Sequence, residues 1–486
     1  MSAAAPPRWA PTLESLRSHP VPAWYDDAKL GIFVHWTMAS VPAFAPRDMD
    51  ILELLRTRYD DLQAQTPYVE WYENSLKIPG SPVWNYHREH YGERPYASFR
   101  EDFEKGGIAR LDPDAWAEAF RAAGARYVVF VTKHHDGYCL WPSRVANPRR
   151  PGWASPRDCV GELARAVRAR GMRFGVYYSG GLDWTFNPEA GRTLADTMAS
   201  VPGGDYPAYA DAQVRELIER FGPEVLWNDI AWPTRPEALW RLFADYYEAA
   251  PEGLVNDRWL TPSWVTRALR VRPVRALADR LLRRLVRSGK ADLTPPRPPH
   301  CDTRTPEYAV FPTARREKWE CVRGIDKSFG YNRVSREEDF LSERELIHSF
   351  ADIVSKNGNL LLNVGPRGED AAIPEPQRRR LAWLGAWLRT NGAAVYGTRP
   401  WSRAEGTTRE GPDVRFTTKG GAVYAIVLGT PPGTSLTLLD FAPPEGARVE
   451  LLGRGPLVWK RDGDALRLEL GAPLPPAPAH AFSISS

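Results

Sequence analysis

Several features that would assign this sequence to a protein class at once are scarce or missing. Its 486 residues contain only four cysteines, and none of them forms a CxxC or another spacing typical of metal ligands. No apolar run approaches the roughly 20 residues that a membrane-spanning helix needs, so we expect no membrane partner. The formal net charge of +4 is too small over this length to indicate a nucleic-acid partner.

The N-terminal segment also has no targeting pattern. Its sequence, MSAAAPPRWAPTLE, contains no basic stretch followed by an apolar core, as a secretory signal would. Together with the few cysteines, this predicts a cytoplasmic protein with reduced thiols. No cofactor motif occurs and we expect no cofactor. The oligomeric state stays open, and a homo-oligomer is one of the options.

The middle of the chain repeats an amphipathic helix, a glycine and a short apolar strand. Helical patterns over 112–124, 159–171 and 209–222 each end in glycine. The strands predicted after these helices are Arg126–Thr132, Arg173–Ser179 and Glu224–Asn228, and an earlier strand is predicted at Gly31–His35. Alternating helices and strands indicate a parallel sheet. The sequence therefore predicts an α/β fold with a (β/α)8-type, TIM-like barrel.

The pattern changes after about Tyr396. Short alternating segments such as VRFTTK, AVYAIVLG and ALRLELG follow one another, separated by turn residues. This spacing is typical of an antiparallel β-sandwich. We therefore predict a catalytic barrel over residues 1–396 and a C-terminal β-sandwich over 397–486.

A basic insertion over about 260–300 interrupts the barrel pattern. It contains an apolar stripe made of Val274, Leu277, Leu281 and Leu285, with arginines opposite. The basic residues are Arg267, Arg270, Arg272, Arg275, Arg280, Arg283, Arg284, Arg287 and Lys290. We expect a surface helix that packs this stripe against the barrel. The alternative is an amphipathic helix that binds an acidic surface.

The predicted strand ends carry polar and aromatic residues of reactive types. They include His35, His134-His135, Tyr177, Asp229 and the run Asn256–Trp259. Catalytic groups of parallel barrels lie at the C-terminal ends of the strands. Imidazole and guanidinium groups bind hydroxyls, and tryptophan faces cover the C–H side of a sugar ring. Hydrolysis of a glycoside needs two carboxyl groups, which Asp229 and a later glutamate would supply.

Longer motifs then make the sequence recognisable. It contains WYDDAKLGIFVHW at 24–36, GARYVVFVTKHHDGYCLW at 124–141, LWND at 226–229, TPEY at 305–308 and VSKNGNLLLNVGP at 354–366. Over nearly its whole length it resembles glycoside hydrolase family 29, the α-L-fucosidases, and within it bacterial members active on simple α-L-fucosides. The resemblance implies a retaining exo-α-L-fucosidase that acts on a fucosylated oligosaccharide or glycoconjugate through a covalent fucosyl-enzyme.

The resemblance also implies roles for individual residues. Asp229 matches the nucleophile and Glu307 the general acid/base, although Glu70 lies in a region that some members use for the acid. The residues that match the surroundings of the fucose are His35, His134, His135, Tyr177 and Arg258, with Glu70 and Trp71 on a closing loop and Trp227 and Phe329 as apolar walls. The basic insertion lies between VNDRW and TPEY, where relatives are much shorter, so it could shift the loop that carries Glu307.

Three other functions compete with this one. An α-L-galactosidase would use the same fold, because L-galactose differs from L-fucose only by a 6-hydroxyl. A sugar-binding protein without activity is disfavoured by the presence of both Asp229 and Glu307. A metal-dependent hydrolase could use His134 and His135, but neighbouring residues of a strand point to opposite faces, so we expect no metal.

Overall fold

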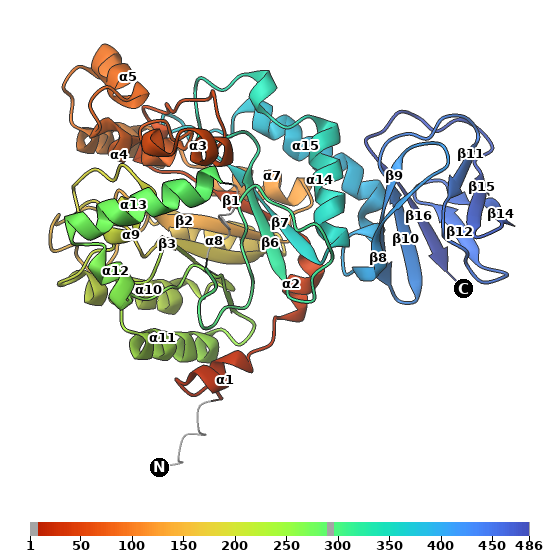
Figure 1. The fold of residues 1–486 in the computed structure, drawn as a ribbon, viewed down its shortest axis with the longest axis horizontal. Coiled ribbons are helices and arrows are strands. Elements are labelled where there is room, and N and C mark those ends of the chain that lie inside the picture. The colour runs from red at the N-terminus through yellow and green to blue at the C-terminus, as the bar shows by residue number, and fades with distance from the viewer. Residues whose placement is uncertain (1–7, 289–295, 486) are drawn as a thin grey trace.

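The computed structural model describes residues 8–288 and 296–485, which form two bodies (Figure 1). The N-terminal body surrounds a parallel sheet with helices. The C-terminal body consists of antiparallel strands and packs beside helices α14 and α15 (Figure 1). In these described ranges, no helix is both long and apolar enough to cross a membrane.

The N-terminal body contains a seven-stranded sheet in the order β5-β4-β3-β2-β1-β7-β6. Each hydrogen-bonded pair of neighbours is parallel. The strands are β1 Leu30–Val34, β2 Tyr127–Lys133, β3 Arg173–Ser179, β4 Val225–Asp229, β5 Leu254–Val255, β6 Trp319–Gly324 and β7 Gly358–Val364. All four strands predicted from apolar runs are present, each within one residue of its expected bounds.

The gap between β5 and β6 is filled by the extended segment 302–308. The Asp302 amide donates to the Val255 carbonyl of β5 at 3.0 Å, and the Tyr308 amide donates to the Val322 carbonyl of β6 at 2.9 Å. The segment thus takes the eighth strand position and closes the ring. Its irregularity follows from Pro306, which has no N–H for a ladder. The prediction of a (β/α)8-type barrel is confirmed.

Helices cover the outside of the barrel. The three helical patterns of the sequence correspond to α7 Pro113–Ala122, α8 Cys159–Ala169 and α10 Tyr206–Phe221, and the barrel is also covered by α11 Pro236–Ala249, α14 Glu343–Ser355 and α15 Glu375–Asn391. Further helices lie in the N-terminal part and the loops: α1 Leu13–Arg17, α2 Ala23–Ala28, α3 Ile51–Thr57, α4 Tyr72–Leu76, α5 Pro82–Tyr91, α6 Phe99–Phe103, α9 Leu194–Ala199, α12 Trp264–Ala268 and the longer α13 Arg272–Arg287. Gly222, at φ 50°, ends α10 in the left-handed conformation that glycine adopts without a steric penalty.

The C-terminal body is a β-sandwich, as predicted. A six-stranded sheet in the order β13-β12-β16-β10-β9-β8 faces a three-stranded sheet in the order β11-β15-β14. The strands are β8 Arg399–Thr407, β9 Asp413–Lys419, β10 Ala422–Val427, β11 Ser435–Leu438, β12 Arg448–Leu451, β13 Gly455–Pro456, β14 Val458–Asp462, β15 Ala465–Glu469 and β16 His480–Ser485. Phe416, Leu436, Leu468 and Phe482 belong to the core between the sheets. The domain boundary at 396/397 stays a prediction.

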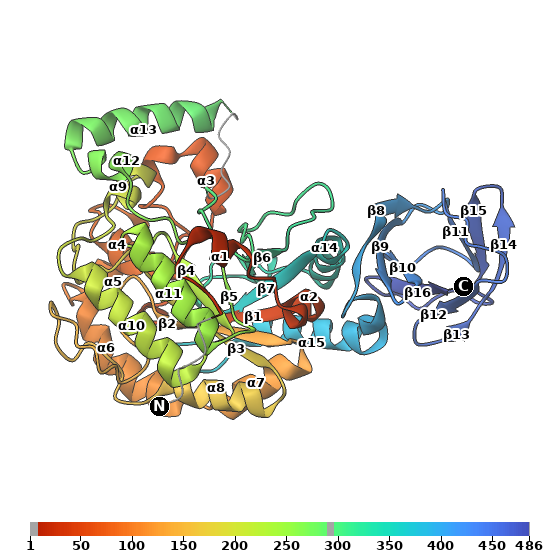
Figure 2. The ribbon, with the colours of Figure 1, turned by 90° about the horizontal axis from the view of Figure 1, so that it is seen from below.

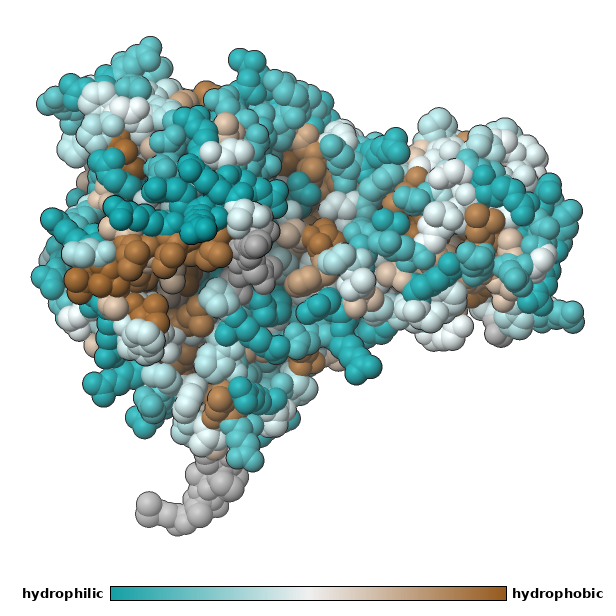
Figure 3. Space-filling view, viewed as in Figure 1, coloured by the Kyte–Doolittle hydropathy of each residue, from teal (hydrophilic) through white to brown (hydrophobic). Residues whose placement is uncertain are grey.

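The apolar stripe of the insertion does not pack against the barrel, so that expectation was wrong. Val274, Leu277, Leu281 and Leu285 are 40%, 57%, 55% and 47% exposed. Figure 3 shows a hydrophobic band next to a hydrophilic one in the region of α13. Residues 289–295, which include Lys290, lie outside the described part of the chain.

Helix α13 lies at the edge of the barrel domain near α3 and α9 (Figure 2). Polar side chains, rather than the stripe, attach it there. Asp279 accepts hydrogen bonds from the Tyr59 hydroxyl at 3.2 Å and the Thr193 hydroxyl at 3.0 Å. Arg275 pairs with Asp196 at 2.9 Å, at α9. These ion pairs and hydrogen bonds turn the polar positions inward, which leaves the stripe facing solvent.

Helix α15 approaches α7 closely at Gly385, and this contact gives a test of the packing. A Cβ at Gly385 would lie 2.1 Å from the Ala122 carbonyl oxygen. Alanine is the better helix former by roughly 1 kcal/mol, so Gly385→Ala would stabilise α15 if there were free space around the new Cβ atom. We expect destabilisation by about 1–3 kcal/mol instead, because backbone must move. Thermal unfolding measures the sign, with the exposed Ala382→Ser as the control; a higher melting temperature for Gly385→Ala would contradict the contact.

Candidate functional site

The C-terminal strand ends surround a cavity of about 220 Å³. All the site residues predicted from the sequence line it, except His135. They are His35, Glu70, Trp71, His134, Tyr177, Trp227, Asp229, Arg258, Glu307 and Phe329. His135 lies directly behind the wall, with its Nε2 atom 3.9 Å from the Asp229 carboxylate. Residues separated by more than 200 positions in the sequence are therefore neighbours here, because the barrel brings its strand ends together.

Asp229 is the last residue of β4, and its carboxylate is held by several donors. The Tyr177 hydroxyl donates to Oδ2 at 2.8 Å, and the backbone amide of Ile230 donates to Oδ1 at 2.8 Å. Burial, as the larger cause, and the neighbouring Asp229 carboxylate both raise the pKa of Tyr177. The phenol therefore keeps its proton and acts as a hydrogen-bond donor. Ile230 has φ 67°, a conformation that β-branched residues rarely adopt. The turn that presents the carboxylate is therefore strained, as functional sites often are.

Glu307 lies on the segment that closes the barrel and shares a partner with Asp229. The Arg258 guanidinium contacts Glu307 Oε1 through Nη2 at 2.8 Å and Asp229 Oδ1 through Nη1 at 3.4 Å. Burial opposes the charge on Arg258, but the carboxylates of Glu307, Asp229 and Asp257 outweigh it and raise its pKa. One guanidinium thus joins the two carboxylates across the cavity.

Asp257 fixes the segment that carries Glu307, a role that the sequence analysis did not assign. Its carboxylate accepts a hydrogen bond from the Thr305 amide at 3.1 Å and from Arg304 Nε at 2.7 Å. Arg258 adds a bond from Nη2 to the Thr305 carbonyl at 3.0 Å. The only sequence signal for Asp257 was its place in the NDRW run at a strand end.

The histidines of the site are buried and uncharged. Burial lowers the pKa of His35 and of His135 to about 3, and it lowers that of His134 well below the usual value. The Nδ1 atom of His35 lies 2.6 Å from Asn363 Oδ1, an acceptor, so its proton is on Nδ1 and Nε2 is left as an acceptor. Neutral imidazoles of this kind suit hydroxyl groups, which both donate and accept.

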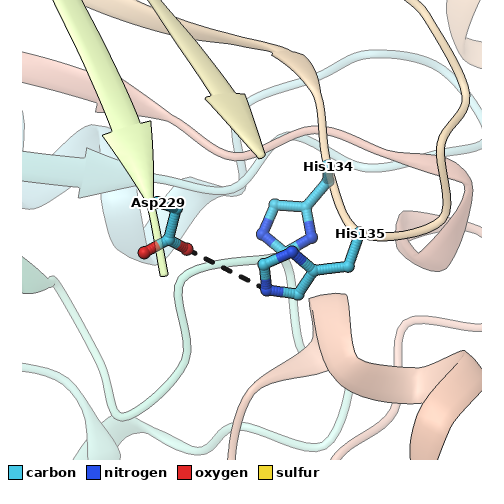
Figure 4. Close-up of side chains that lie close together, drawn as sticks. All are labelled: His134, His135 and Asp229. Carbon is cyan, nitrogen blue, oxygen red and sulfur yellow. Dashed lines mark ion pairs between the residues drawn. The ribbon is translucent and has the colours of Figure 1, made fainter. Parts of the chain in front are cut away.

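His134, His135 and Asp229 also form a cluster that could hold a cation, since their ligand atoms lie within 4.8 Å of one another. Figure 4 shows both imidazoles beside Asp229. The expectation that the two rings point to opposite faces was wrong: β2 ends at Lys133, so the alternation of a strand no longer applies. The Arg258 charge on the same carboxylate opposes a second cation there. The absence of a metal stays a prediction.

Comparisons with known proteins identify the family. The family profile described as "Alpha-L-fucosidase" matches residues 1–393. The chain is 33% identical to the tissue α-L-fucosidase of Bos taurus over 487 residues, covering 97% of this chain and 89% of the relative. The chain belongs to the α-L-fucosidase family.

Solved structures agree with this assignment. A structure described as an α-L-fucosidase has 40% identity and a TM-score of 0.83, and covers 99% of this chain and 100% of its own. The Thermotoga maritima α-fucosidase in complex with a mechanism-based inhibitor has 39% identity and a TM-score of 0.81, with the same coverage. The resemblance noted in the sequence is confirmed, and with it the assignment of this fucosidase-family chain as a glycoside hydrolase.

The cavity lining also contains residues that the sequence did not reveal, among them Phe33 and Tyr68. Phe33 lines the cavity two positions before His35, on the same face of β1. Tyr68 lies two positions before Glu70 and donates from its hydroxyl to Glu307 Oε2 at 3.4 Å. Phe33 was within reach of the sequence, because it precedes His35 by two positions on a strand, whereas Tyr68 precedes a 3-10 helix, where this spacing does not place side chains on one face.

Glu70 differs from the other two acids in being nearly enclosed. It is 5% exposed, and its Oε2 atom accepts the Gly330 amide at 2.9 Å. Burial raises the pKa of Glu70 to about 8. The carboxyl group is therefore protonated at neutral pH and can donate one hydrogen bond.

This shift predicts a pH dependence of stability. Glu70 loses its proton at an ordinary glutamate pKa of 4.5 when the chain is unfolded and at about 8 when it is folded. The folded state binds more protons between these values, so the free energy of unfolding falls as pH rises through this window. In Glu70→Gln the free energy of unfolding should fall over this pH window by a few kcal/mol less than in the parent protein, since one pKa unit corresponds to about 1.4 kcal/mol. Denaturant unfolding at pH 5 and pH 8.5 measures it; an equal fall in both proteins would show that Glu70 is ionised.

Proposed function

We propose that this chain is a retaining exo-α-L-fucosidase, with Asp229 as the nucleophile and Glu307 as the general acid/base. The observation that carries the proposal is the contact of one guanidinium, that of Arg258, with both carboxylates at the cavity. Retention needs two carboxyl groups about 5–5.5 Å apart, one on each side of the scissile bond. A cavity of about 220 Å³ suits one terminal sugar, which supports exo action on a fucosylated oligosaccharide or glycoconjugate.

In the first step, Asp229 attacks the anomeric carbon while Glu307 protonates the departing oxygen, which leaves fucose covalently bound to Asp229. The Tyr177 hydroxyl and the Ile230 amide hold the carboxylate for attack. In the second step, Glu307 takes a proton from water, and the water attacks the same carbon and releases Asp229. Two inversions restore the original configuration, so α-L-fucose is the first product.

Glu307 is preferred to Glu70 as the acid/base because of its access. The Glu307 side chain is 29% exposed, whereas Glu70 is 5% exposed and bonded to the Gly330 amide. An acid/base must reach both the leaving oxygen and an incoming water. Glu70, neutral and enclosed, suits a hydrogen bond to a hydroxyl of the sugar.

A nucleophile test follows from Asp229. Asp229→Gly should abolish turnover of aryl α-L-fucosides, and azide should restore some of it by entering the space of the missing carboxylate. A single displacement gives β-L-fucosyl azide, which NMR identifies. Running the assays of the parent protein with and without a chelator tests the expected independence from metal. An α-configured azide, or a variant of nearly normal rate, would remove Asp229 from this role.

A second test separates Glu307 from Glu70. Glu307→Ala should slow fucosides with poor leaving groups by about 10²–10⁴-fold and spare activated aryl fucosides in the first step. The fucosyl-enzyme then accumulates, and azide should convert it to α-L-fucosyl azide. Glu70→Ala is the matched control and should weaken activity on both substrate types alike. If Glu70→Ala instead shows the leaving-group dependence and Glu307→Ala does not, the two roles are exchanged.

We also propose a reducing, cytoplasmic location. Cys139, Cys159, Cys301 and Cys321 are free thiols, and only Cys301 is more than slightly exposed. Proteins in oxidising compartments more often pair their cysteines.

A further inference from the structure

An apolar groove of about 380 Å³ adjoins the candidate active-site cavity. The two share five lining residues, Leu55, Leu194, Thr197, Ile230 and Arg258. Arg258 contacts both carboxylates, so the junction lies where the proposed reaction takes place. The groove is therefore continuous with the site at Arg258.

The walls of this groove are formed largely by apolar side chains. Leu282 and Val286 of α13 contribute from the insertion, and Met198, Leu260 and Pro262 contribute from the barrel loops. Part of the polar lining is already engaged: Arg270 donates to the Val201 carbonyl at 2.9 Å, and Asp257 holds the Thr305 amide at 3.1 Å. Thr261 and Arg267 also belong to the lining. Most hydroxyl groups of a sugar in this position would still lie against apolar side chains, which makes its burial unfavourable.

The groove depends on the basic insertion, because α12 and α13 supply one of its walls. Asp279 of α13 binds Tyr59, in the turn after α3, and Thr193 at the start of α9, and Arg275 pairs with Asp196 of α9. On this helix the neighbouring residues Leu281 and Leu282 face different surroundings. Leu282 lines the groove, whereas Leu281 is 55% exposed and does not.

We propose that this groove binds the aglycone of the substrate, and that this aglycone is a hydrocarbon chain, as in an alkyl or lipid fucoside. The inference rests on the proposed fucosidase function and adds the substrate class. When fucose occupies the cavity, the group attached to its anomeric oxygen begins at Arg258 and continues into the groove. Burial of the chain, rather than hydrogen bonding, would then supply the selectivity.

The test is a series of methyl, butyl, hexyl and octyl α-L-fucosides, assayed below micelle concentrations. Primary alkoxides of different length are similar leaving groups, so a trend in kcat/KM reports binding of the chain. We expect kcat/KM to rise by up to about fourfold for each methylene and to level off once the groove is full. Fucosyl disaccharides with polar aglycones should not share this gain.

Two variants on α13 assign the trend to the groove. Leu282→Ser should lower the octyl-to-methyl ratio of kcat/KM severalfold, because it makes the lining polar. The matched control Leu281→Ser, one residue away and facing solvent, should keep the ratio of the parent protein. Val201→Trp places a large side chain in the groove from a lining residue outside α13 and should lower the ratio as well. This variant keeps the test decisive if Leu282→Ser does not fold.

The outcomes separate the two proposals. If none of the α-L-fucosides is hydrolysed, the proposed function is overturned. If methyl and aryl fucosides are hydrolysed but kcat/KM is independent of chain length, only the aglycone groove is overturned. The same holds if Leu281→Ser and Leu282→Ser change the ratio equally, because the effect would then not come from the lining.

Discussion

The contact of the Arg258 guanidinium with Asp229 and Glu307 is the interaction on which the site depends. Two carboxyl groups that share one cavity need a partner that contacts both. The Arg258 guanidinium is this partner and fixes their relative position. Arg258 also binds the Thr305 carbonyl, and its neighbour Asp257 binds the Thr305 amide. The dipeptide that balances the charges therefore also fixes the segment that closes the barrel.

Around this charged centre the three histidines and Glu70 are neutral. Burial lowers the pKa values of His35, His134 and His135, which keeps them unprotonated, and raises the pKa of Glu70, which keeps it protonated. A terminal sugar is an uncharged ligand with several hydroxyls, and such donors and acceptors can pair with it without adding charge to a desolvated cavity. These four side chains thus offer such a ligand donors and acceptors that carry no charge.

The sequence predicted the features that depend on local periodicity and strand ends, and missed those that depend on tertiary context. Apolar runs located β1 to β4, and their ends located His35, Tyr177 and Asp229. The closing segment escaped because Pro306 breaks the strand pattern, so only hydrogen bonds to β5 and β6 reveal it. The direction of His134 and His135 was misjudged because both residues follow β2, which ends at Lys133, so the alternation of a strand does not apply to them.

The orientation of α13 is explained better by a role in forming the groove than by a gain in the stability of the barrel. Apolar residues that face solvent gain nothing from burial, and partly exposed ion pairs such as Arg275–Asp196 contribute about 0–1 kcal/mol each. A helix that only covered the barrel would be more stable with its stripe turned inward. The inward face instead combines polar anchors with Leu282 and Val286, the residues that line the groove. The arrangement holds an apolar wall beside Arg258, where a leaving group passes.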